Sequence, residues 1–294
     1  MLNGPSVRFE EMGRLPTFIV IGAMKSGTTS YAWYLDHHPE VAVSRPKEPN
    51  FFAEPGNWGR GVDWYKSLFS SDVPCAGEAS VMYTMVPEFV GAPGRIRQTV
   101  PDVRLLYLVR DPIERMRSMF VHRAEKHQAR GRTFSEAIVQ NPEYVAISQY
   151  GRQIEPYLEL FKEEQLLIVT TDELRADPGA ALARSFHHIG ADPTFLVSTD
   201  QVLNSGAGKR YLSDLGFALA GMIHRTGVRN RMPLKMRRKF KDWFSSAITE
   251  EILHLEDHVE RDLRNALAPD MAVIRRMVEA SGGQVPGWLQ NPRQ

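Results

Sequence analysis

The chain has 294 residues, of which 43% are hydrophobic and 24% charged, a composition typical of a globular protein with one large α/β domain or two small ones. Its formal net charge of +1 gives no overall field that would attract nucleic acid, so any basic site must be local. The single cysteine, Cys75, excludes an internal disulfide and favours a reducing compartment.

The first residues, MLNGPSVRFEEMGRLP, lack the basic-then-apolar pattern of a signal peptide. No apolar run approaches the roughly 20 residues that span a bilayer. We therefore expect a cytoplasmic protein without a transmembrane segment, and the sequence does not predict an oligomeric state.

Short apolar runs rich in β-branched residues alternate with helical patterns. Three strands are expected, at residues 17–22, 104–109 and 166–170. Each is followed by an expected helix, at residues 28–38, 112–127 and 178–189. This alternation predicts an α/β fold in which helices flank a parallel β-sheet.

The segment G-A-M-K-S-G-T-T-S, residues 22–30, links the first expected strand to its helix and has the features of an anion site. Backbone N–H groups and the helix dipole favour negative charge at a helix start. The candidate ligands are Lys25, Ser26, Gly27, Thr28, Thr29 and Ser30. Lys25 precedes Gly27, whereas the lysine of a nucleoside-triphosphatase loop follows the last glycine, so that motif is not met.

A second anion site is expected where R-D-P-I-E-R-M-R-S, residues 110–118, follows the second strand. An arginine at the carboxyl end of a strand lies where open α/β sheets bind ligands. Ser118 comes about two helical turns after Arg110, at roughly 1.5 Å per residue. Taken alone, the segment is also compatible with an arginine-rich surface helix.

The two segments together resemble the PAPS-dependent sulfotransferases, which use 3′-phosphoadenosine-5′-phosphosulfate as donor. Residues 16–30 are similar to the 5′-phosphosulfate loop of the branch that includes heparan sulfate sulfotransferases and many bacterial enzymes. R-D-P-x-E-R-x-x-S resembles the 3′-phosphate motif of that family. The resemblance implies that Lys25 contacts the 5′-phosphate and the oxygen bridging to sulfur, and that Arg110 and Ser118 bind the 3′-phosphate. It also implies nucleotide contacts for Lys209 and Arg210, although a plain solvated loop is the alternative there.

The segment E-P-N-F-F, beginning at Glu48, resembles the place where heparan sulfate-type enzymes carry their catalytic glutamate. The resemblance implies Glu48 as the base, and we expect the two adjacent phenylalanines to desolvate its carboxylate partly. The alternative is a surface carboxylate paired with Lys47. Glu78, in a stretch resembling the family's G-E-x-S-x-x-Y, and His122, one turn after Ser118, are further candidate bases. Ala79 stands where the heparan-type enzymes often have a lysine, and Asn50 and Ala53 stand where they have other polar groups, so the acceptor class stays open.

The hypothesis is a sulfotransferase acting on a hydroxyl or amine of a carbohydrate, lipid or other small molecule, without a metal. We expect a single domain over residues 1–294, with the donor site in 16–192 and a variable helical region at 211–250. The basic stretch 225–241 is a candidate lid over the acceptor. The alternatives are a kinase that uses ATP and magnesium, with Asp111 as metal ligand, and a nucleotide-sensing or membrane-associated module.

Overall fold

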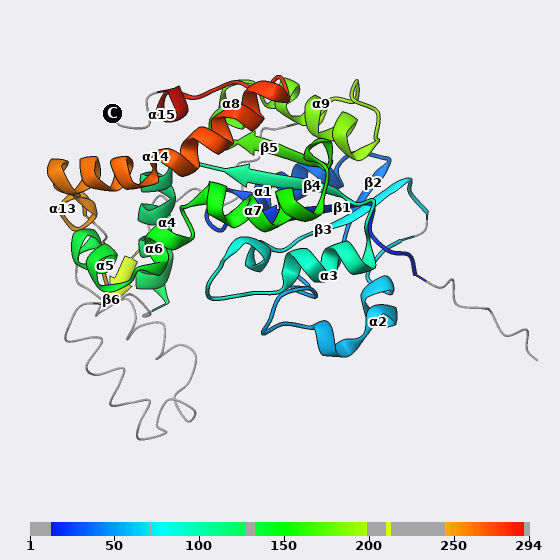
Figure 1. Cartoon of the computed structure of the whole chain (residues 1–294), viewed down its shortest axis with the longest axis horizontal. Helices are drawn as coiled ribbons and strands as arrows, with labels where there is room; N and C mark the ends of the chain where they lie inside the picture. Colours follow the sequence, from blue (N-terminus) through cyan, green and yellow to red (C-terminus); the bar gives the residue numbers. More distant parts are fainter. Residues whose placement is uncertain are drawn as a thin grey trace, which may run out of the picture.

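A computed structural model describes residues 13–70, 72–126, 133–198, 210–212, 245–247 and 249–290. A parallel five-stranded sheet lies at its centre, in the order β2-β3-β1-β4-β5 (Figure 1). Its strands are β1 (Phe18–Gly22), β2 (Val41–Val43), β3 (Cys75–Ala79), β4 (Arg104–Val109) and β5 (Leu166–Thr170). A short antiparallel pair joins β6 (Arg210–Leu212) to β7 (Ser245–Ala247).

Helices follow the strands along the chain. The α-helices are α1 (Thr28–Asp36), α2 (Val62–Lys66), α3 (Ala92–Thr99), α4 (Pro112–Glu125), α5 (Phe134–Gln140), α6 (Glu143–Ala146), α7 (Tyr150–Leu160), α8 (Thr171–Ala176), α9 (Pro178–Ile189), α13 (Glu250–Leu253), α14 (Asp257–Ala280) and α15 (Gly287–Gln290). The 3₁₀ helices are η1 (Trp58–Arg60), η2 (Val81–Thr84) and η3 (Glu163–Gln165).

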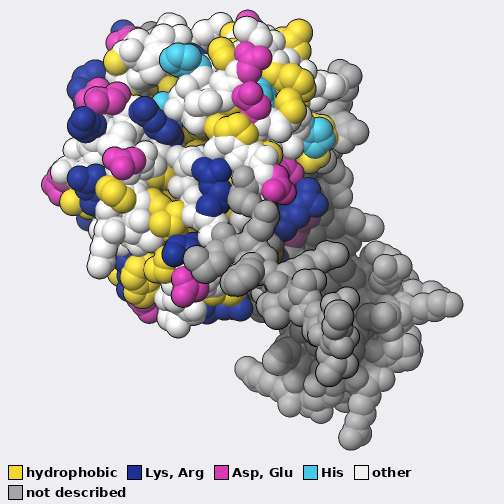
Figure 2. Space-filling model, turned by 90° about the vertical axis from the view of Figure 1, so that its right-hand side faces the viewer, with side chains coloured by type: hydrophobic (Ala, Val, Ile, Leu, Met, Phe, Trp, Pro, Cys, Tyr) yellow, Lys and Arg dark blue, Asp and Glu magenta, His cyan; other side chains and the backbone are white. Residues whose placement is uncertain are grey.

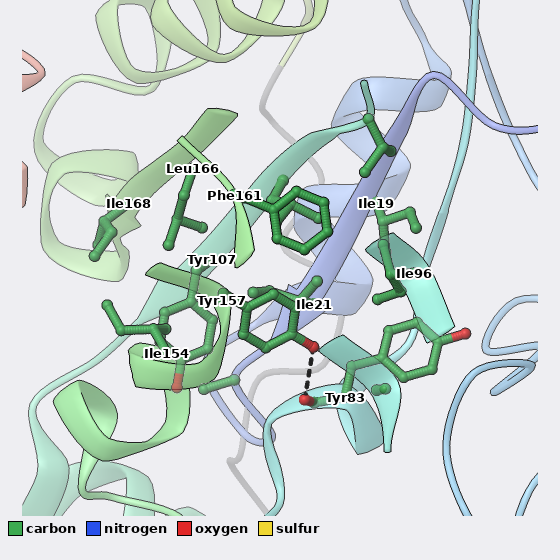
Figure 3. Close-up of a cluster of buried hydrophobic side chains, with 14 of the residues drawn as sticks. Ile19, Ile21, Tyr83, Ile96, Tyr107, Ile154, Tyr157, Phe161, Leu166 and Ile168 are labelled. Carbon is green, nitrogen blue, oxygen red and sulfur yellow. Dashed lines mark hydrogen bonds between the residues drawn. The ribbon is translucent and has the colours of Figure 1, made fainter. Parts of the chain in front are cut away.

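Both faces of the sheet are covered, which explains why its central strands are continuously apolar. Successive side chains of a strand point to opposite faces. Val20 of β1 packs with α1 and α9 on one face. Ile19 and Ile21 pack with α3, α7 and α14 on the other, in the cluster drawn in Figure 3. The expected α/β fold with a parallel sheet is therefore confirmed.

The three expected strands and their helices are present, with bounds that differ by at most a few residues. Strands β2 and β3 were not predicted. Strand β2 has only three residues, and β3 reads C-A-G-E-A, which lacks the β-branched and aromatic residues that mark a strand. Both are placed by their neighbours in the sheet and not by local propensity.

The connections that follow β1 and β4 lead to opposite edges of the sheet, although these two strands are parallel neighbours. After β1 the chain passes through α1 to β2 at one edge, and after β4 it passes through α4 to α7 and on to β5 at the other edge. Open α/β sheets bind ligands at such a divergence, outside the carboxyl ends of the strands. The two expected anion sites follow these two strands.

The candidate lid at 225–241 and the predicted ligand Lys209 lie outside the described residues. Among the residues that are described, no helix combines the length and the apolar character needed to cross a membrane. The face shown in Figure 2 carries basic and acidic side chains side by side, in keeping with the small net charge.

Candidate active site

The loop between β1 and α1 has an unusual backbone at two positions. Gly27, the N-cap of α1, has a φ of 90°, and Lys25 has a φ of 69°, which non-glycine residues rarely adopt. Gly27 offers no side chain to cap the helix, and the first turn of α1 carries no acidic residue. Thr28 is buried, Ser30 is half-buried and Thr29 is exposed. No carboxylate in the first turn therefore neutralises the positive end of the helix dipole. This favours the binding of an external anion.

Arg110 comes directly after β4 and is only partly neutralised. Its Nη2 donates to Oε2 of Glu114 at 3.1 Å, whereas its buried Nε has no hydrogen-bond partner in the described part of the chain. Glu114 also accepts from Arg117. One carboxylate therefore faces two guanidinium groups, and the Nε of Arg110 keeps its capacity to donate to an anion.

The two segments are fixed to each other by hydrogen bonds. The Ala23 N–H donates to the Leu108 carbonyl at 2.7 Å, which holds the start of the first loop against β4. The hydroxyl of Tyr150, at the start of α7, donates to the Arg110 carbonyl at 2.8 Å. Burial raises the pKa of Tyr150 to about 12, and the Ser26 side chain is among the groups that oppose this rise. Tyr150 therefore holds the backbone of the second segment and keeps its proton at neutral pH.

Strand β5 also reaches this place. A Cβ added to Gly27 would lie 4.0 Å from the side chains of both Leu108 and Thr171, so the ends of β4 and β5 border the first loop. The hydroxyl of Thr171 is buried and has no hydrogen-bond partner in the regions described. A buried polar atom without a partner is costly, and its presence here is consistent with a polar ligand.

Asp111, the metal ligand of the kinase alternative, is engaged on both oxygens. Its Oδ1 accepts from the Glu114 N–H at 2.9 Å, which caps α4, and its Oδ2 accepts from Arg264 of α14 at 3.0 Å. Asp111 thus holds the start of α4 in place.

Ser118 and His122 lie on α4, on the same side as Glu114, because they follow it at intervals of four residues. Both are half-buried. Strand β6, which begins at Arg210, packs against α4 (Figure 1). The structure therefore brings the backbone of Arg210 to the helix that carries Ser118.

Glu48 lies on the loop after β2 and has a left-handed backbone, with a φ of 59°. The side chain is half-buried, in keeping with the expected partial desolvation. Phe51 and Phe52 are fully buried in the core, whereas the Glu48 side chain is 37% exposed and pairs with Lys47 at 2.6 Å. The phenylalanines anchor the loop, and the carboxylate stays in contact with solvent.

Glu78, the second candidate base, is the buried carboxylate of the region. It is fully buried at the end of β3 and accepts from Tyr65 at 2.5 Å, from Tyr83 at 2.8 Å and from Ser80. Burial raises its pKa to about 7, and the hydrogen bonds from Ser80, Tyr65 and Tyr83 oppose this rise. The charge of Glu48 is a further cause that raises the pKa of Glu78, so the two carboxylates interact.

Four candidate residues from separate parts of the sequence thus lie at the same end of the sheet. Lys25 follows β1, Glu48 follows β2, Glu78 is the penultimate residue of β3 and Arg110 follows β4. The carboxyl ends of parallel strands lie together, so the fold itself brings these residues to one side of the molecule.

Comparison with known proteins identifies the class. A sequence model of the sulfotransferase domain matches residues 15–213, more than half of the chain, so the chain belongs to the sulfotransferase family. A crystallised sulfotransferase from Alicyclobacillus acidocaldarius has the same fold, with a TM-score of 0.63 and 23% identity over 93% of this chain and 98% of that one. The residues that the family model matches include the loop at residues 22–30 and the segment at residues 110–118.

Curated relatives include enzymes of heparan sulfate. The chain is 26% identical to bovine bifunctional heparan sulfate N-deacetylase/N-sulfotransferase 2 over 303 residues, which cover 96% of this chain and 31% of the relative. It is 31% identical to human heparan sulfate glucosamine 3-O-sulfotransferase 5 over 178 residues, which cover 56% of this chain and 50% of the relative. The chain thus spans half or less of the length of these relatives.

Sequence patterns did not identify Tyr150 or Thr171 as part of the site. Neither residue belongs to a motif, and each is far in sequence from the residues it approaches. The only available signal was that Thr171 directly follows a predicted strand, where ligand contacts concentrate.

Proposed function

We propose that the protein transfers a sulfuryl group from PAPS to a hydroxyl or amine of a small-molecule or carbohydrate acceptor. The observation that carries this proposal is that the two candidate anion-binding segments follow the adjacent strands β1 and β4. The Ala23 N–H holds the first segment against Leu108 of β4, and Tyr150 of α7 holds the carbonyl of Arg110 in the second. A donor with phosphates at both ends of its ribose needs two such segments at a fixed spacing.

The described residues suit this donor. Lys25 and the first turn of α1, which has no acidic residue, would hold the 5′-phosphosulfate, with Ser26, Gly27, Thr28, Thr29 and Ser30 around it. Arg110, whose Nε has no partner among the described residues, and Ser118 would hold the 3′-phosphate. Lys209, which lies outside the described residues, and Arg210 are the further predicted nucleotide contacts.

The reaction is an in-line displacement at sulfur. The acceptor oxygen or nitrogen forms a bond to sulfur while the bond from sulfur to the 5′-phosphate oxygen breaks, and Glu48 takes the acceptor proton. Negative charge grows on the departing oxygen, where Lys25 stabilises it. Adenosine 3′,5′-bisphosphate leaves. The sulfuryl group carries less charge than a phosphoryl group, so the proposal includes no metal.

A carbohydrate is the acceptor class that the relatives favour, since two of them are named for heparan sulfate. The positions where heparan-type enzymes carry polar groups differ here. Ala53 and Ala79 are fully buried, and Asn50 is held by its own loop, with its Nδ2 donating to the Glu48 carbonyl at 3.0 Å. These differences favour an acceptor other than heparan sulfate itself.

Calorimetry with two nucleotides tests the donor site. Adenosine 3′,5′-bisphosphate should bind at least about thirtyfold more tightly than AMP, because only the first presents a 3′-phosphate to Arg110. Arg110→Ala should abolish the preference. Arg104→Ala, at the opposite end of the same strand, is the matched control and should keep it. Equal affinities in the wild-type protein would disprove the second site, and turnover lost in EDTA and restored by magnesium would contradict the metal-free chemistry.

A further inference from the structure

Glu78 is the centre of a hydroxyl cluster that reaches the Glu48 loop. The side chain is fully buried, and both of its oxygens accept hydrogen bonds. Among the donors, Tyr65 lies on α2, Tyr83 lies on η2, and Ser80 is the residue directly before η2. A carboxylate so enclosed cannot touch an acceptor molecule, which argues against Glu78 as the base.

Two of these hydroxyls also hold the backbone of the loop that carries Glu48. The Asn50 N–H donates to the Ser80 hydroxyl at 3.0 Å, and the Ser80 hydroxyl donates to Glu78. The Phe52 N–H donates to the Tyr83 hydroxyl at 3.3 Å, and the Tyr83 hydroxyl donates to Glu78. Each hydroxyl can accept from the loop because its own proton is directed to the carboxylate.

The loop needs such support because its backbone is strained. Glu48 and Asn50 both have positive φ angles, 59° and 48°, in a region that non-glycine residues adopt at a cost. Strained backbone persists only where the surroundings fix it. The anchored amides of Asn50 and Phe52 lie two and four residues after Glu48, so they act on the part of the loop that sets the direction of its carboxylate.

We propose that Glu78 is a positioning residue, which orients the Ser80 and Tyr83 hydroxyls so that they hold the Glu48 loop in its catalytic conformation. This inference rests on the proposed role of Glu48. In this role Glu78 acts only through the Ser80 and Tyr83 hydroxyls and does not contact the donor or the acceptor.

The protonation state of Glu78 should therefore matter to the loop. The groups that face it are Tyr65 from α2, Tyr83 from η2, Tyr157 from α7 and Glu48 from the loop, each of which interacts with its charge. The three tyrosines have raised pKa values because they are buried, so they stay neutral donors at neutral pH. Ionised Glu78 accepts from the hydroxyls, whereas protonated Glu78 carries a proton of its own that competes for one of these positions.

A matched pair of variants separates positioning from mere stability. Tyr83→Phe and Tyr65→Phe each remove one hydroxyl that donates to the same Glu78 oxygen, but only the Tyr83 hydroxyl also accepts from the loop. Tyr83→Phe should lower kcat about tenfold, with the affinity for adenosine 3′,5′-bisphosphate unchanged, and Tyr65→Phe should leave kcat within about twofold. Ser80→Ala, which removes the other link, should resemble Tyr83→Phe.

Hydrogen exchange of the peptide covering residues 48–53 provides a readout that does not depend on activity. Exchange should be faster in Tyr83→Phe and Ser80→Ala than in Tyr65→Phe. Equal exchange and equal kcat in the two tyrosine variants would overturn the positioning role. If Glu48→Gln kept full turnover while the exchange difference was present, the assignment of the base would fail and the anchoring of the loop would stand.

Discussion

The phenol of Tyr150 donates a hydrogen bond to the backbone carbonyl of Arg110 across 2.8 Å, although 40 residues separate the two in sequence. Tyr150 is fully buried at the start of α7, on the face of the sheet opposite α1. Its ring meets that of Tyr107 edge-on, at 5.9 Å between centroids. The position of Arg110 is therefore set by a helix outside its own motif, and the donor site depends on the packing of α7.

Removing this hydroxyl should weaken donor binding without removing any group that touches the donor. Tyr150→Phe is expected to raise the Kd for adenosine 3′,5′-bisphosphate about five- to tenfold, the effect of losing one buried hydrogen bond that positions a ligand. Titration calorimetry measures it directly. The affinity for AMP should change by less than about twofold, because AMP lacks the group that Arg110 binds.

Tyr157→Phe is the matched control. Tyr157 lies on the same helix and is equally buried, and its hydroxyl donates to the Tyr83 carbonyl at the same distance of 2.8 Å. This hydrogen bond is the dashed line in Figure 3. Loss of the Tyr157 hydroxyl should lower the free energy of unfolding by about 1 kcal/mol, as loss of the Tyr150 hydroxyl should, but should leave nucleotide affinity unchanged. Equal losses of affinity in the two variants would mean that α7 supports the site only through general stability.

The base assignment gives a second prediction. Glu48→Gln should preserve nucleotide binding and lower turnover by about 10²–10⁴, the usual contribution of a positioned base. Lys47→Met removes the partner that pairs with Glu48 at 2.6 Å and is the control for electrostatic effects. It should change turnover by less than about fivefold, since a pair this exposed contributes little. Full activity in Glu48→Gln, with loss in His122→Ala, would transfer the role of base to His122.

The sheet core and the two phosphate segments could be predicted because each is a local pattern. Continuous apolar runs mark β1, β4 and β5, and the glycine–lysine turn is contiguous in sequence. The burial of Glu78 could not be predicted in this way. Its hydroxyl partner Tyr65 comes from a short helix, and a five-residue strand of otherwise small residues does not reveal that its one carboxylate, Glu78, is buried. The sequence favoured Glu48 as the desolvated residue because of the adjacent Phe51 and Phe52, whose rings turned out to anchor the loop in the core.

The start of α4 offers a third prediction, on stability. Asp111 caps α4 and pairs with Arg264 at 3.0 Å, with both side chains 15% exposed. Asp177 caps α9 in the same Asp-Pro setting but is exposed, and no ion pair to it is seen among the described residues. Asp177→Ala should cost about 1 kcal/mol of unfolding free energy, the value of a cap, whereas Asp111→Ala should cost about 2–4 kcal/mol. Urea denaturation measures both, and similar losses would show that the pair with Arg264 adds nothing.

The buried carboxylate of Glu78 should make stability depend on pH. Burial raises its pKa from 4.5 to about 7 in the folded protein, so its stabilising contribution is complete below about pH 4.5 and is lost as the pH rises through 7. Glu78→Gln cannot ionise and should lack this loss. The free energy of unfolding of the wild-type protein, relative to that of the variant, should therefore fall by roughly 2–3 kcal/mol between pH 5 and pH 8. Urea denaturation of both proteins at the two pH values gives the difference, in which the titration of all other groups cancels. A constant difference would mean that Glu78 ionises as readily in the folded protein as in the unfolded chain, and that its hydroxyl donors fully offset its burial.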